Sequence, residues 1–168
     1  KGGNMGASHG HLDAGSFVFD ALGKRWAWDL GSDNYALPGY FSSNSSSGTD
    51  RWDYYRCRAE GHNTVIVNPG NGPDQTYGGT APILLYESEP RGQRSAAMFD
   101  LTPVTSGVTR LWRGFQLVND RRQANDQDEI QAASPGDVHW FFHIKNRIPS
   151  VAHDTDEKAV KLTQGSER

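Results

Sequence analysis

The sequence predicts an all-β protein, an antiparallel β-sandwich, and three observations support this expectation. Apolar and polar residues alternate with a period of two in several short segments, which is the pattern of half-buried strands. The 19 glycines and eight prolines are scattered through the 168 residues and separate these segments with turns. No segment has the apolar spacing that would predict a helix of more than two turns. One domain, residues 1–168, is expected for a chain of this length, as a fragment of a larger parent.

The first predicted element is a β-hairpin over residues 14–30. Phe17 and Phe19 alternate with their neighbours in its first strand, and Trp26 and Trp28 do so in its second. A glycine and a lysine stand between the two strands at the distance expected of a hairpin turn. Further strands are predicted over residues 62–68, 81–89, 95–102, 107–120, 128–134 and 137–146.

Two polar segments, residues 31–50 and 68–82, interrupt this rhythm and are predicted to be loops. The first contains an aromatic group at Tyr35, Tyr40 and Phe41, and its serine-rich half is expected to be mobile. Loops of this length within a compact domain are usually functional or mobile.

Composition excludes several classes of protein. The net charge is −3 with acids and bases interspersed, so neither nucleic-acid binding nor a basic membrane-binding face is expected. No apolar run approaches the roughly 20 residues that a membrane-spanning helix needs. The single cysteine, Cys57, excludes an intrachain disulfide framework, and we expect it to be structural.

The segment SHGHLD contains candidate metal ligands. In an extended strand His9 and His11 would point to the same face. Asp29 ends the hairpin and is therefore expected beside His11, and His62 begins a neighbouring strand at the same rim. Imidazole and carboxylate groups are ligands that zinc prefers. Structural alternatives remain open, with Asp29 as a turn cap and His62 as a hydrogen-bonded strand-end histidine.

The segment RWDYYRCR, residues 51–58, is a candidate surface for an acidic polysaccharide. Arginines such as Arg56 can bind carboxylates or sulfates in a fork, and rings such as that of Tyr54 offer flat surfaces to sugars. The alternative is an edge strand with mixed faces.

Taken together, GASHGHLDAGSFVFDALGKRWAWDLG, NYALPGYF and YYRCRAEGHNTVIVNPG resemble the C-terminal β domain of the heparinase II/III-like polysaccharide lyases. RGFQLVND, DEI and HWFFHI are similar to the later strands of that family, so the resemblance extends over most of the chain. It implies a larger parent in which an N-terminal helical α/α toroid packs against the β-sandwich. It also implies cleavage of uronic-acid polysaccharide by β-elimination, and a periplasmic or secreted location.

The resemblance further implies a zinc ion held by His11, Asp29 and His62, with His9 in the active-site cleft. A tyrosine of the loop after the hairpin is expected nearby, and Tyr40 is the one we select. In such a reaction a base removes the proton at C5 of the uronate and an acid protonates the leaving oxygen at C4. The toroid would supply the rest of the cleft, so the zinc is expected to organise the β domain, and the isolated chain to be inactive.

Two other functions remain open. A non-catalytic carbohydrate-binding sandwich would have the same strand pattern. Gly3 followed by the His-x-His pair also resembles a cupin metal motif, but Ala14 and Gly15 stand where that motif needs an acid. The sequence leaves open whether the polysaccharide is heparin, heparan sulfate, alginate or another uronate polymer.

Overall fold

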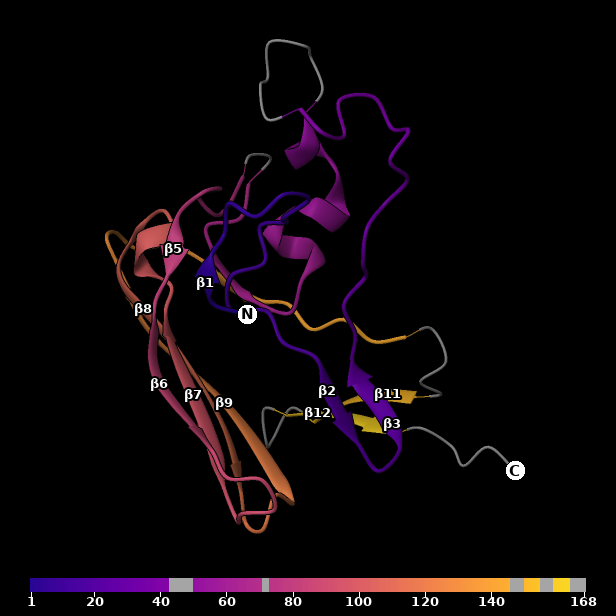
Figure 1. Ribbon diagram of the computed structural model, residues 1–168, viewed down its shortest axis with the longest axis vertical. Helices are drawn as coiled ribbons and strands as arrows, with labels where there is room; N and C mark the ends of the chain where they lie inside the picture. The colour runs from indigo at the N-terminus through magenta and orange to yellow at the C-terminus, as the bar shows by residue number, and fades with distance from the viewer. Residues whose placement is uncertain (43–49, 71–72, 146–149, 155–158, 164–168) are drawn as a thin grey trace.

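The chain folds into antiparallel sheets, with no α-helix in its described part (Figure 1). The computed structural model describes residues 1–42, 50–70, 73–145, 150–154 and 159–163. The strands are β1 (Gly3–Asn4), β2 (Phe19–Ala21), β3 (Lys24–Ala27), β4 (Val65–Val67), β5 (Thr80–Ala81), β6 (Ile83–Ser88), β7 (Ser95–Asp100), β8 (Val108–Val118), β9 (Gln123–Ala132), β10 (Val138–Trp140), β11 (Ser150–Asp154) and β12 (Ala159–Thr163). The prediction of an all-β antiparallel fold is confirmed.

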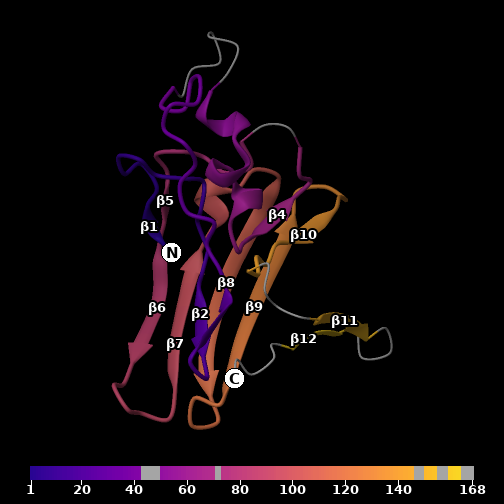
Figure 2. The ribbon, with the colours of Figure 1, turned by 90° about the vertical axis from the view of Figure 1, so that its right-hand side faces the viewer.

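The main sheet has the strand order β6-β7-β8-β9, and each neighbouring pair is antiparallel. The hairpin β2–β3 lies across from this sheet, as the two views show (Figures 1 and 2). Phe17, which leads into the hairpin, packs on Phe115 of β8 with ring centroids 5.0 Å apart. Strand β4 pairs with β10 and carries the segment that begins at His62. This two-layered arrangement is consistent with a β-sandwich.

Two buried clusters hold the layers together. One lies between the N-terminal segment and the main sheet and contains Met5, Ala14, Val65, Ala81, Leu101, Val104 and Leu111. The other lies beneath the candidate site and contains Leu12, Tyr40, Trp52, Cys57, Ala59 and Ile66. Cys57 is fully buried in this second cluster, as its structural assignment predicted.

The hairpin exists, but it is shorter than the predicted span of residues 14–30. Its turn residues Leu22 and Gly23 have φ angles of 53° and 71°. Positive φ at both central positions is the geometry of a type I′ turn, which matches the twist of the flanking strands. Residues 14–18 lie outside the strands, because the backbone there bonds to other segments: Ala14 N–H, for example, donates to the side chain of Gln75.

Three predicted segments differ from the structure. The strand predicted over residues 137–146 ends at Trp140, because the following backbone turns to bond residues before β4. The strand predicted over residues 128–134 begins earlier, at Gln123. Residues 51–61 form three consecutive 3-10 turns, η2 (Arg51–Asp53), η3 (Tyr55–Cys57) and η4 (Ala59–Gly61), so the edge-strand alternative for residues 51–58 is wrong. A fourth turn, η5 (Thr102–Val104), follows β7.

Residues 43–49, the serine-rich half of the long loop, lie outside the described residues.

Candidate functional site

The structure brings His11, His62 and Asp29 together in a chain of side-chain contacts. Nδ1 of His62 donates to Oδ2 of Asp29 at 2.8 Å. Nε2 of the same ring lies 3.2 Å from Nδ1 of His11. His62 is 1% exposed, whereas the other two side chains are partly exposed. The three predicted ligands therefore meet, but in series along the His62 ring.

Both oxygens of the Asp29 carboxylate are engaged. Oδ2 accepts from His62, and Oδ1 accepts from the backbone N–H of Gly31 at 2.8 Å. The hydrogen bond from His62 is the largest cause that lowers the pKa of Asp29 to about 2. Asp29 is thus a stable anion that accepts from Nδ1 and orients the His62 ring, so that Nε2 faces His11.

His11 is held in its neutral form. Its pKa is lowered to about 4, chiefly by burial and also by the neighbouring His62 and Arg51. A neutral imidazole is the form in which histidine binds a metal ion.

The donor types at this site suit zinc, and two of the three have a suitable separation. Two nitrogens bound to one tetrahedral zinc at about 2.0–2.1 Å lie roughly 3.3 Å apart, close to the 3.2 Å between His11 Nδ1 and His62 Nε2. Asp29 instead contacts the far nitrogen of His62, the position of a carboxylate that supports a ligating histidine. In the described residues no three His, Cys, Asp or Glu side chains converge as a metal site.

His9 lies in a turn, so the expectation that it shares a strand face with His11 is wrong. Its φ angle is 61°, in the left-handed region, and the side chain is exposed. Arg51 holds this turn, because its buried guanidinium donates to the carbonyls of His9 and Gly10, each at 3.0 Å. A third bond runs from Arg51 to the carbonyl of Tyr40 at 2.9 Å. His9 is therefore presented to solvent on a fixed turn.

Tyr40, the predicted catalytic tyrosine, is buried. Its side chain is 1% exposed, and its hydroxyl accepts a hydrogen bond from Asp33 N–H at 3.2 Å. Burial also raises the pKa of Tyr40. The choice of Tyr40 over its neighbours is not supported by this arrangement, because a substrate cannot reach the hydroxyl. Tyr35 is 51% exposed, and its ring centroid lies 5.7 Å from that of His9.

The two predicted substrate-binding residues brace the loop after the hairpin. The hydroxyl of Tyr54 donates to the carbonyl of Pro38. Arg56 donates to the carbonyls of Leu30 and Ser32 at 3.1 and 3.0 Å. Arg56 remains exposed at the rim next to the hairpin, with Nε 3.9 Å from a carboxylate oxygen of Asp33.

Asn63 is a site residue that our sequence reasoning passed over, although it directly follows His62. Its fully buried amide donates to the carbonyls of Phe17 and Trp28, at 2.8 and 2.9 Å, and so clamps both ends of the hairpin. Its Oδ1 accepts from the backbone N–H of His143 at 2.6 Å. The only sequence signal was an amide inside an apolar strand start, where a buried polar group needs partners.

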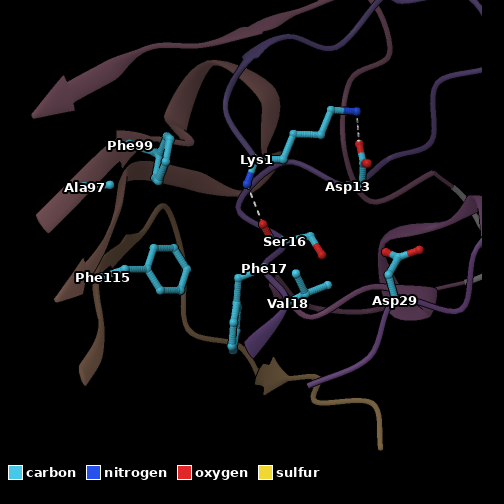
Figure 3. A pocket seen from close by; sticks show the side chains of 9 residues that line it. All are labelled: Lys1, Asp13, Ser16, Phe17, Val18, Asp29, Ala97, Phe99 and Phe115. Atoms are coloured by element: carbon cyan, nitrogen blue, oxygen red, sulfur yellow. Dashed lines mark hydrogen bonds and ion pairs between the residues drawn. The ribbon is translucent and has the colours of Figure 1, made fainter. Parts of the chain in front are cut away.

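A hollow of about 450 Å³ opens beside this site, with Asp29 on its edge (Figure 3). Lys1 and Asp13 lie along its upper side in this view and form an ion pair at 2.6 Å, with Ser16 below them. Its other walls are apolar and come from residues that include Phe17 and Phe115. The candidate site is thus an exposed histidine and a His–His–Asp chain next to an open, partly apolar hollow.

The family model described as "Heparinase II/III-like, C-terminal" matches residues 1–168. The chain belongs to this family. No curated protein matches the chain significantly. Membership of the heparinase II/III-like family confirms the predicted resemblance.

Membership of this family indicates that the parent protein is a polysaccharide lyase, which acts on polysaccharide and has other domains. None of the helices in the described residues is long and apolar enough to cross a membrane.

Proposed function

We propose that this chain is the β domain of a lyase that cleaves uronic-acid polysaccharide by β-elimination, with His9 at the reaction centre. The observation that carries the proposal is an exposed histidine on a fixed turn, two residues before His11 of the His11–His62–Asp29 chain, in a domain of the heparinase II/III-like family. A helical toroid of the same parent would form the other wall of the cleft, in a periplasmic or secreted protein.

The reaction breaks the C5–H and C4–O bonds of the uronate ring and forms a C4=C5 double bond. A base takes the C5 proton, the electron pair of that bond becomes the double bond, and the oxygen at C4 leaves with its own pair and is protonated. Histidine is the commonest side chain for such proton transfers. The His9 ring contacts the rings of Tyr35 and Phe41, and in the described part of the chain its nitrogens make no hydrogen bond, which leaves them available to a substrate.

A developing negative charge on the uronate carboxylate needs donors or positive charge nearby. Arg56 is an exposed guanidinium next to the hairpin and supports binding of an anionic chain at this rim. Tyr54, in the same segment, contributes a half-buried ring, whereas its hydroxyl donates to the carbonyl of Pro38.

We also propose that this site binds zinc, with His11 and His62 as ligands and with Asp29 as the carboxylate that supports His62. When bound, zinc would supply a positive charge that locks the two imidazoles in place. His11 contributes a neutral imidazole, and Asp29 accepts from Nδ1 of His62, which leaves Nε2 on the side of His11.

The experiment compares the full-length parent with its His9→Ala variant on uronate polysaccharides. Ultraviolet absorbance of the unsaturated uronate reports elimination, and a reducing-end assay reports any cleavage. We expect the variant to keep its fold and zinc content but to lose about 100-fold or more in turnover. Reducing ends without the ultraviolet signal would mean hydrolysis, and an unchanged rate in His9→Ala would remove His9 from the mechanism.

A further inference from the structure

The outer face of the main sheet carries a groove that the proposed lyase site does not use. Strand β8 directs Trp112, Gly114 and Gln116 to this face, since Arg113 and Phe115 between them contact the inner layer. Because Gly114 has no side chain, a depression of about 170 Å³ remains between the indole and the amide. Met98 of β7 and Gln127 of β9 stand opposite Gly114 in the two neighbouring strands.

Strand β9 lines the same face with planar polar side chains. Asn125, Gln127 and Glu129 stand opposite Gln116, Gly114 and Trp112 in the register. In the described part of the chain the amides of Gln116 and Gln127 make no hydrogen bond, so their donors and acceptors face solvent. Apolar contact comes from Leu85 and Met98 at the other wall.

The Trp112 indole has a cationic neighbour on one side. The guanidinium of Arg110 lies 5.3 Å from the centroid of the Trp112 ring, and Nη2 of Arg110 is 4.0 Å from a carboxylate oxygen of Glu129. Trp112 is half-buried, so part of its ring surface is available at the groove. A rigid aromatic surface with neighbouring amides supplies contact area together with directional hydrogen bonds.

The charges on the groove select the kind of ligand. Glu129 is the one charged side chain among the described residues that line it, and it is paired with Arg110. Arg110 lies over the lining residue Trp112 and contacts Glu129, so the two opposite charges offset each other and the groove has no excess positive charge for a uronate or a sulfate. Its volume is below the roughly 300–1,000 Å³ of pockets that enclose a drug-sized molecule, which suits one or two rings of an extended chain.

We propose that this groove binds uncharged sugar rings of a polysaccharide, with Trp112 as the stacking surface and Gln116, Asn125 and Gln127 as hydrogen-bonding partners of the hydroxyl groups. It is a second carbohydrate site, on the face of the sheet opposite the layer that contains His62 and Asn63. Its role does not depend on the lyase reaction, because a binding site of this kind would anchor the substrate chain away from the cleft.

The test titrates the 168-residue chain with chitohexaose and cellohexaose, with heparin as the polyanionic probe, and follows tryptophan fluorescence and amide chemical shifts. We expect saturable binding of at least one neutral hexasaccharide at about millimolar concentration, with shifts confined to β8 and β9. Trp112→Ala should weaken it at least about 10-fold. Trp26→Ala is the matched control, because Trp26 lies in the hairpin, away from the groove, where its indole N–H donates to the carbonyl of Ala21.

A second variant keeps the proposal testable if Trp112→Ala does not fold. A Cβ on Gly114 would meet nothing closer than 3.9 Å, so Gly114→Leu should be accommodated while its side chain fills the groove and abolishes binding. The proposal is overturned if neither neutral hexasaccharide binds, or if binding survives in both variants. Stronger binding of heparin at this face would also overturn it, as would concentration-dependent self-association that Trp112→Ala removes.

Discussion

The ring of His62 is bonded at both nitrogens, and this decides what each neighbour can do. Asp29 occupies Nδ1 and His11 faces Nε2. The carboxylate therefore orients the imidazole, and the two histidines present nitrogens to each other. At the residue scale the site is a pair of imidazoles with one supporting anion.

This arrangement predicts unequal effects of two substitutions on zinc content. His11→Ala removes one of the two converging nitrogens, so we expect the purified protein to lose its zinc. Asp29→Asn keeps both imidazoles and should retain about one equivalent with affinity reduced roughly 10- to 100-fold, the usual cost of losing a supporting carboxylate. Elemental analysis and competition with a chromophoric chelator measure both. Complete zinc loss in Asp29→Asn with full zinc in His11→Ala would reverse the assignment.

Two tyrosines near His9 should also differ. Tyr35 is exposed beside His9, whereas the Tyr40 hydroxyl is buried against Asp33 N–H. In the full-length parent we expect Tyr35→Phe to lower turnover by about 10-fold or more. Tyr40→Phe should instead lower the free energy of unfolding by about 1 kcal/mol, with turnover of the folded fraction unchanged. Rates and urea denaturation of both variants measure this. A larger loss of turnover in Tyr40→Phe would restore Tyr40 as the catalytic tyrosine.

At the scale of elements, buried polar side chains hold the segments around the site. Arg51, at the start of η2, holds the turn of His9 and the loop at Tyr40 through three carbonyls. Asn63, just before β4, clamps the two ends of the hairpin. Each joins segments that are far apart in the sequence. Each therefore positions the backbone around the site residues.

Removing the Arg51 guanidinium should therefore cost stability. Arg51→Met leaves three carbonyls without their donor, and we expect the free energy of unfolding to fall by about 3 kcal/mol. Arg56→Met is the matched control: Arg56 also donates to backbone carbonyls but is exposed, so we expect a loss within about 1 kcal/mol. Urea denaturation of both variants measures the difference. Equal small losses would show that the buried network does not stabilise the turn.

At the scale of the whole molecule, two groups in different layers should make opposite contributions to the pH dependence of stability. Burial raises the pKa of Asp128, in β9, to about 6, although Arg113 opposes this rise. Burial lowers the pKa of His11 to about 4. Between pH 4 and 6 the folded state binds the Asp128 proton that the unfolded state releases, and the unfolded state binds the His11 proton that the folded state lacks.

As the pH falls from 7 to 5, Asp128 therefore adds stability and His11 removes it. In metal-free protein we expect the free energy of unfolding of Asp128→Asn to fall over this range by about 1 kcal/mol more than that of the unsubstituted 168-residue chain. His11→Ala should lose less, or gain. Other shifted groups such as Glu60 and His143 remain in both variants and cancel in the comparison. Urea denaturation at the two pH values measures it, and equal changes in both variants would contradict the assignment.

Much of the architecture was accessible from the sequence, because alternation and turn residues are local signals. The strands around residues 83–88, 95–100 and 108–118 were predicted within a few residues. The start of β9, before Asp128, was not, because that part of the strand is polar and its inward face contains Asp126, which looks like a solvent-exposed residue; Asp128 lies on the same face. They are tolerated inside because Arg113 of the neighbouring strand pairs with both, at 2.5 and 3.3 Å.

By itself, the sequence determined the all-β class, the family, and the set of residues His11, Asp29 and His62 that meet at one rim, since each follows from periodicity or motif. Only the tertiary structure decided how they meet, with Asp29 behind His62, because side-chain direction depends on contacts across the fold. It likewise decided that His9 sits on a left-handed turn and that Tyr40 is enclosed. Both depend on the buried guanidinium of Arg51, a long-range contact that no local pattern encodes.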